Sequence, residues 1–180
     1  MRIPMPKLFH YTSRRCLESI LQSQAILPDL QAHDPTVHGK QPLVWVSSMS
    51  PWDPICRATL ELDPEGWANL LPDKVPGPPY GAARIEVACS MTQQWDSLLA
   101  SNGADEFAIF KLAQTGYENK SDPEKWRVCP GPLSICFWLD IQVWDGLVWG
   151  PLDTAGCDLW SMGDFDTFVS QHSFTKEINL

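Results

Sequence analysis

The stretch Lys-Leu-Phe-His-Tyr-Thr occupies residues 7–12 and is the part of the chain that most strongly indicates its fold. Aromatic and β-branched residues favour a strand, and side chains alternate between its two faces. This period places Leu8 and His10 on one face, and Phe9 and Tyr11 on the other. The sequence therefore predicts a short strand that carries a histidine next to two aromatic residues.

A helix is predicted to follow this strand without a linker. Ser13 is a favourable N-cap residue, and Leu17, Ile20 and Leu21 form an apolar stripe with helical spacing. The helix should end near Ala25. A strand that enters a helix directly exposes the helix N-terminus, where backbone N–H groups attract anionic ligands.

The remaining pattern mixes strands and helices without repeats or a domain boundary, so we expect one α+β domain over residues 1–180. A proline-rich loop is predicted over residues 63–80, and Asp145-Gly146 is predicted to form a type I′ hairpin turn. Further strands are expected at 43–47, 83–88, 126–128 and 135–144, and helices at 53–62, 92–100, 106–114 and 164–170.

Composition excludes several classes of protein. The chain has 180 residues, 44% of them apolar, and a net charge of −9, which argues against a nucleic-acid partner. The sequence has neither an apolar run long enough for a membrane span nor an apolar leader at its start. We therefore expect a cytoplasmic protein that has reduced cysteines and no membrane partner. Phosphate-loop, G-x-S-x-G and H-E-x-x-H motifs are absent from the sequence.

His10 is the first candidate site residue, since it lies at a strand end just before a helix N-terminus. Its imidazole can bond a ligand hydroxyl, and Tyr11 or Thr12 can supply a second hydrogen bond. The alternative is a structural histidine bonded to the backbone.

A second candidate set is Trp45, Ser47 and Ser48. These serines are either turn residues or hydroxyls presented to a ligand beside an aromatic wall.

A third candidate set is Asp140, Gln142 and Trp144, which period two places on one strand face. A carboxylate, an amide and an indole on one face indicate either a wet cleft or the solvated side of an antiparallel sheet.

Residues 8–13 with the helix that follows resemble the opening strand and helix of ADP-ribosyltransferase-like proteins, in particular bacterial toxin-associated groups that begin with a His-Tyr motif. Two further blocks, residues 44–47 and 143–146, are similar to bacterial proteins that share this opening. The resemblance implies two small, mainly antiparallel sheets around a cleft for NAD. It implies that His10 bonds an NAD ribose and that Ser47 and Ser48 support the nicotinamide side.

The resemblance also implies an acidic residue on a late strand that stabilises positive charge on the ribose in the transition state. Gln142 occupies the position where this glutamate is expected. Either Asp140 or Asp145 takes that role, or activity is low or lost. Three functions follow: a mono-ADP-ribosyltransferase that consumes NAD to modify a macromolecular target, expected to be a protein; an inactive relative that binds a nucleotide or a protein; and an NAD glycohydrolase.

Overall fold

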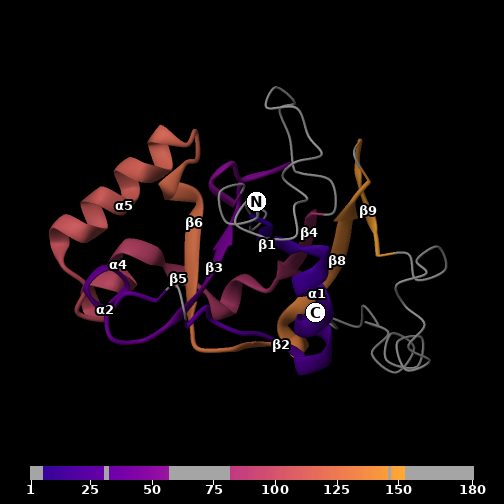
Figure 1. The fold of residues 1–180 in the computed structure, drawn as a ribbon, viewed down its shortest axis with the longest axis horizontal. Helices are drawn as coiled ribbons and strands as arrows, with labels where there is room; N and C mark the ends of the chain where they lie inside the picture. Colours follow the sequence, from indigo (N-terminus) through magenta and orange to yellow (C-terminus); the bar gives the residue numbers. More distant parts are fainter. Residues whose placement is uncertain (1–5, 31–32, 57–81, 146, 153–180) are drawn as a thin grey trace, which may run out of the picture.

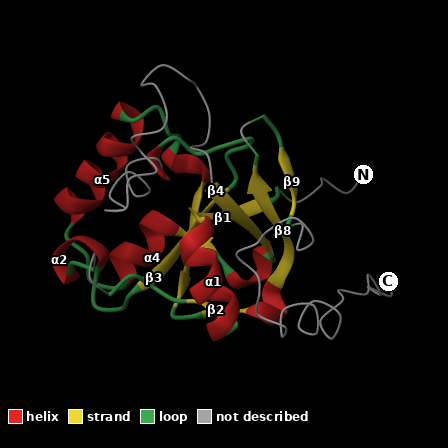
Figure 2. Ribbon diagram, turned by 45° about the vertical axis from the view of Figure 1, so that its right-hand side comes forward, coloured by secondary structure: helices red, strands yellow, loops and turns green. Residues whose placement is uncertain are grey.

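The computed structural model describes residues 6–30, 33–56, 82–145 and 147–152. They form an α+β fold in which antiparallel strands make a seven-stranded sheet with the order β5-β6-β3-β1-β4-β8-β9. A second sheet pairs β2 with β7. Figures 1 and 2 show α2, α4 and α5 gathered at one end of the molecule, with β8 and β9 toward the other.

The strands are β1 (Leu8–Ser13), β2 (Ala25–Ile26), β3 (Leu43–Ser47), β4 (Ala82–Val87), β5 (Gln93–Gln94), β6 (Trp126–Pro130), β7 (Leu133–Ser134), β8 (Trp138–Trp144) and β9 (Trp149–Pro151). The α-helices are α1 (Arg14–Ser23), α2 (Pro35–His38), α4 (Trp95–Ser101) and α5 (Glu106–Glu118). The short 3₁₀ turns are η2 (Cys89–Met91), η3 (Pro123–Lys125) and η4 (Ile135–Phe137).

The large sheet is joined weakly at its centre. A single register pair, Phe9 with Ser47, connects β1 to β3. By contrast, every residue of β1 is paired with β4, and every residue of β3 is paired with β6. We therefore describe the sheet as a three-stranded half (β5, β6 and β3) and a four-stranded half (β1, β4, β8 and β9), which meet at the junction of β1 and β3.

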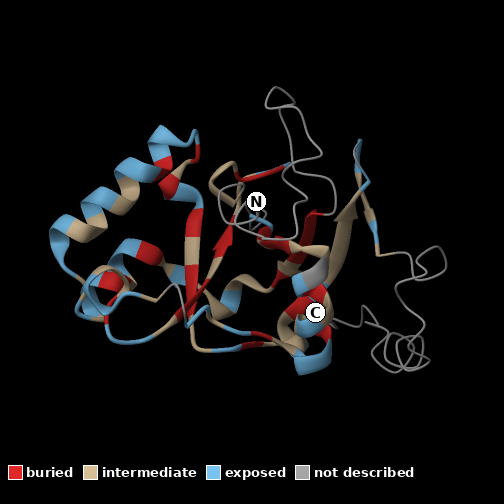
Figure 3. Ribbon diagram, viewed as in Figure 1, coloured by how far each residue is buried: buried red, intermediate tan, exposed pale blue. Residues whose placement is uncertain are grey.

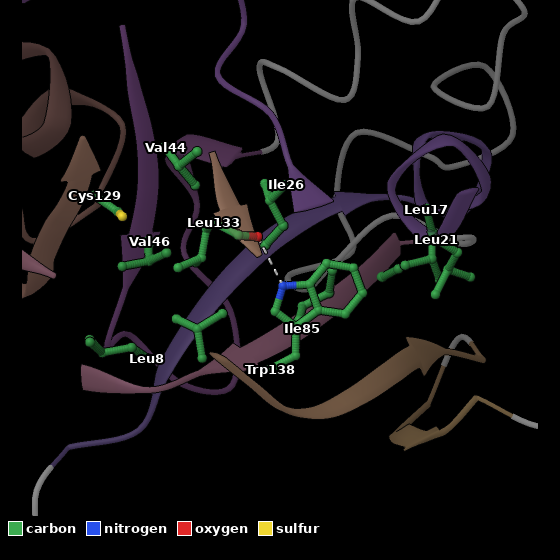
Figure 4. Close-up of a cluster of buried hydrophobic side chains, with 12 residues drawn as sticks. Leu8, Leu17, Leu21, Ile26, Val44, Val46, Ile85, Cys129, Leu133 and Trp138 are labelled. Atoms are coloured by element: carbon green, nitrogen blue, oxygen red, sulfur yellow. Dashed lines mark hydrogen bonds between the residues drawn. The ribbon is translucent and has the colours of Figure 1, made fainter. Parts of the chain in front are cut away.

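The first face of the sheet carries the main core (Figure 4). Leu8 and Ile85 lie on this face, and α1 covers it with Leu17 and Leu21. Trp138 is fully buried there, and its Nε1 donates to the carbonyl of Leu133 at 3.3 Å. Phe9 and Tyr11 belong to a separate cluster on the second face, as the period-two pattern predicted.

The transition from β1 to α1 also confirms its prediction. Ser13 has extended backbone angles, and its Oγ accepts from the N–H of Cys16 at 3.1 Å. The helix ends at Ser23, two residues before the expected end, because Gln24 adopts the left-handed conformation with φ of 55°.

On the second face, α4 and α5 cover the three-stranded half. Trp95 and Leu99 of α4 pack with Trp126 and Val128 of β6. Helix α5 approaches closely at Gly116, where an added Cβ would lie 2.5 Å from the Trp126 ring. This half is therefore a sheet layer under a helix layer.

Several predicted boundaries were wrong for identifiable reasons. β8 begins at Trp138 because residues 135–137 form a 3₁₀ turn, and α5 continues to Glu118 instead of ending near residue 114. The hairpin exists, but Trp144 pairs with Trp149, so a two-residue turn at 145–146 is wrong. Asp145 organises the longer loop by accepting from the N–H groups of Leu147 and Val148, at 2.7 and 2.8 Å.

The predicted loop 63–80, the predicted helix 164–170 and most of the predicted helix 53–62 lie outside the described residues. Within the described residues the cysteines are free thiols, and Cys16 and Cys136 are exposed. A helix with the length and apolar character needed to cross a membrane does not occur among the described residues.

Candidate functional site

His10 lies at the junction of the two sheet halves. Its Nδ1 is 3.0 Å from the carbonyl oxygen of Trp45 in β3, and a carbonyl only accepts, so Nδ1 carries the proton. Burial lowers the pKa of His10, which favours the neutral ring. A neutral ring protonated at Nδ1 has an acceptor at Nε2, the atom that a ligand hydroxyl would need.

Tyr11 and Thr12 flank His10 but differ in environment. The Tyr11 hydroxyl donates to the carbonyl of Met49 at 2.6 Å, and its ring is on the second face. Burial, opposed by the charge of Arg84, raises the pKa of Tyr11 far above its usual value. Thr12 is buried and shares the first face with His10.

The two serines at the end of β3, Ser47 in the strand and Ser48 just after it, are bonded to the backbone of nearby segments. Ser47 Oγ accepts from the N–H of Met49 at 3.1 Å, which makes a local turn. Ser48 Oγ donates to the carbonyl of Lys125 at 3.3 Å, and its N–H donates to the same oxygen at 2.9 Å. These contacts agree with the interpretation as turn residues.

Trp45 has a packing role in the three-stranded half. Its ring contacts those of Trp95 and Trp126, with centroids 6.0 Å apart in both pairs. The Trp45 carbonyl, rather than its ring, meets His10.

Asp140, Gln142 and Trp144 share the second face, as predicted. Gln142 Nε2 donates to Asp140 Oδ2 at 2.9 Å, and Trp144 packs against the cluster of Phe9 and Tyr11. Gln142 Oε1 accepts from Arg84 Nε at 2.7 Å. The strand face therefore carries a continuous polar chain from Arg84 to Asp140.

Arg84 is a residue that sequence reasoning missed. It is only 9% exposed, and its guanidinium carbon lies 4.2 Å from the Phe9 ring centroid and 4.4 Å from that of Trp149. Its Nη1 donates to the carbonyl of Pro51 at 3.0 Å. The available signal was an arginine in an apolar strand, in register with the face that carries Gln142.

Residues 48–56, which we call the crossing segment, connect the two halves on the second face. The Pro51 carbonyl accepts from both Arg84 and Trp149 Nε1 of the four-stranded half. Asp53, fully buried, accepts from Ser121 Oγ and, at 3.0 Å, from Trp126 Nε1 on the other side. Sequence reasoning also missed Asp53, because nothing local distinguishes a buried carboxylate from a helix-capping one.

The register separates the predicted catalytic residues. Tyr11, Arg84 and Gln142 are directly paired across β1, β4 and β8, whereas His10 is paired with Ile85 and through it with Ile141. Paired residues share a face, so His10 and Gln142 point to opposite faces. β4 also lies between β1 and β8, so these two strands are not neighbours.

The described residues include no group of three or more His, Cys, Asp or Glu side chains that could hold a metal ion. No family model matches the chain, and no curated protein or solved structure matches it significantly.

Proposed function

We propose that this chain is an ADP-ribosyltransferase-like protein that binds NAD at the junction of β1 and β3. One observation carries the proposal: the central sheet divides into two halves that share a single register pair, with His10 next to that division. The resemblance implies two small, mainly antiparallel sheets around a cleft for NAD, and the two halves of the seven-stranded sheet are the part of this structure most similar to that arrangement. The Nε2 acceptor of His10 suits a ribose hydroxyl.

Under this proposal NAD is a substrate, and the acceptor is a macromolecular target, with a protein expected. Departure of nicotinamide leaves positive charge on the ribose, so a nearby carboxylate would accelerate the reaction. Asp140 is the first candidate. Asp145 is exposed, and hydrogen bonds from the N–H groups of Val148 and Leu147 lower its pKa, which suits a turn-forming residue.

A specific observation favours a second candidate function, an inactive relative that binds a nucleotide or a protein. Asp140 and Gln142 are bonded to each other and through Gln142 to Arg84, on the face opposite to His10. A carboxylate in that position can reach the ribose beside His10 only if NAD passes around the end of a strand.

Calorimetric titration with NAD tests the binding site. His10→Ala should weaken NAD binding by about 1–3 kcal/mol, which is the cost of losing one buried polar partner. His38→Ala is the matched control, because His38 also contacts Trp45 but edge-on from α2. If neither wild type nor variants bind NAD, the proposed function is wrong.

Nicotinamide release tests catalysis. If NAD passes around the end of a strand and brings its ribose to the second face, Gln142→Glu should raise the rate by about 10²–10³, since a carboxylate stabilises the transition state more than the ground state. If Asp140 already supplies the charge, Asp140→Asn should abolish release and Gln142→Glu should add little. NAD binding without release by any of these proteins would establish the inactive relative, whereas release without transfer to a target would establish the glycohydrolase.

A further inference from the structure

Helix α5 has an exposed aromatic stripe on its outward side. Phe107, Phe110 and Tyr117 are 65%, 62% and 58% exposed. Their spacing of three and seven residues places them along one side of the helix. Figure 3 shows α5 at the edge of the molecule, with much of its surface exposed.

The stripe is separate from the part of α5 that holds the helix on the protein. Ile109, Leu112 and Ala113 pack into the core of the three-stranded half, and Gly116 contacts Trp126. The helix therefore has an apolar inner side and a second apolar side that faces solvent. Aromatic residues gathered on a surface in this way are typical of protein interfaces.

Acidic residues outnumber basic ones in α4 and α5 beside the stripe, although Lys40 lies near Gly103 between the two helices. A hollow between α4 and α5 is lined by Asp96, Ser97, Ala100, Ala104, Glu106 and Ile109. Residues 95–119 contain four acidic residues and one basic residue, Lys111. The Lys111 ammonium lies 5.5 Å from the Phe107 ring centroid and bonds Gln114 at 3.2 Å, so it covers part of the stripe.

From this juxtaposition we propose that the outward side of α5 and the hollow beside α4 dock a basic amphipathic segment of a partner protein. The aromatic rings offer apolar contact area, and Asp96 and Glu106 offer attraction to lysine or arginine. The charge of the surface favours a basic partner over a second copy of this acidic chain. The site shares no residue with the proposed NAD site, so the two proposals stand or fall separately.

The test uses the full chain and two synthetic helical peptides. Both have leucine at positions i, i+3, i+4 and i+7, and they differ in carrying lysine or glutamate at the other positions. Fluorescence anisotropy should show that the lysine peptide binds at least about tenfold more tightly than the glutamate peptide. Raising the salt concentration should weaken this binding.

Variants then locate the site. The double variant Phe107→Ala/Phe110→Ala should weaken lysine-peptide binding by about tenfold or more, as expected for aromatic anchors. Asp96→Asn/Glu106→Gln should weaken it less and reduce its salt dependence. Leu147→Ala is the control, since Leu147 is 84% exposed on the β8–β9 hairpin. Thermal melting should be nearly unchanged in all three because the side chains are exposed.

Equal binding of the two peptides, or unchanged binding by the double aromatic variant, would overturn the proposal. So would self-association of the wild type, seen by analytical ultracentrifugation and abolished in the double aromatic variant, because the occupant would then be a second copy. Binding to neutral phosphatidylcholine vesicles that depends on Phe107 and Phe110 would likewise replace the partner segment with a membrane.

Discussion

The second face of the central sheet is covered by different structures in its two halves. The three-stranded half is covered by α4 and α5, and its interior is a cluster of Trp95, Trp126 and Leu99. The four-stranded half is covered in the described residues by the crossing segment, and its interior has Arg84 between two aromatic rings. A helix layer stabilises mainly through apolar area, whereas the crossing segment depends on a few specific hydrogen bonds.

The largest effect should come from the point where the crossing segment enters the three-stranded half. Asp53→Ala removes the acceptor of Ser121 Oγ, Trp126 Nε1 and the Ile55 N–H, and leaves Trp126 Nε1 with Ser121 Oγ as its acceptor at 2.9 Å. We expect the free energy of unfolding to fall by about 3 kcal/mol in urea titrations. Asp122→Ala, which removes only the cap of η3, should cost about 1 kcal/mol or less. Similar losses in the two variants would show that Asp53 is not a central link.

Gly116→Ala tests how tightly the helix layer is packed. In an exposed helix this change stabilises by about 1 kcal/mol. Here the new methyl group would lie 2.5 Å from Trp126 and 2.7 Å from Pro123, so we expect a loss of about 2 kcal/mol. Thermal or urea unfolding measures this loss of stability, and the Thr115→Ala variant, changed at an exposed position of the same helix, is the control. A more stable Gly116→Ala protein would mean that α5 is free to move away from β6.

Arg84→Lys tests the other half. Lysine keeps the charge but cannot both stack between two rings and donate to Gln142 and Pro51 in a planar fork. A loss of about 1–2 kcal/mol is expected by the same measurement. Arg127→Lys in β6 should cost well under 1 kcal/mol, because Arg127 has one side-chain bond, to Gln94, among the contacts described. Equal effects would remove the contrast between the two halves.

The smallest effect is expected at His10, at the junction of β1 and β3, and it concerns the pH dependence of stability. Burial lowers the pKa of His10, so the folded state binds fewer protons there than the unfolded state, whose histidine pKa is about 6.5. The stability from this difference is fully present above about pH 6.5 and is lost as the pH falls through the folded value. His10→Gln should flatten the dependence of unfolding free energy on pH between about 7 and 5. His38→Gln should remove a separate contribution to this pH dependence, because burial lowers the pKa of His38 too.

Local patterns predicted most of the elements but not the way they combine. The β1 strand, its two faces and the Ser13 cap follow from spacing and capping chemistry, and each is confirmed. The shared face of Asp140 and Gln142 follows from period two in the same way. Spacing along the chain does not determine which strands are neighbours in the sheet. The sequence therefore could not predict that β4 lies between β1 and β8, or that His10 is separated from Gln142 as a result.

The candidate site was predictable only as a set of residues, not as an arrangement. His10 carries local signals both for a ligand and for a backbone bond, and the partner of its Nδ1 is a carbonyl 35 residues away. Arg84 and Asp53 act through residues that are distant in sequence, which single-residue chemistry cannot identify. The resemblance to ADP-ribosyltransferase-like proteins stays a prediction for the same reason: it depends on short blocks whose assembly is a property of the whole chain.

The Pro51 carbonyl oxygen accepts two hydrogen bonds, and this has a consequence for which substitutions the protein tolerates. The acceptor for Arg84 and Trp149 is a main-chain oxygen, which every amino acid provides, whereas each donor belongs to one kind of side chain. These two bonds therefore restrict residues 84 and 149 without restricting which side chain stands at 51. A saturation library at residues 84 and 149 should therefore show that both donor positions are intolerant of substitution.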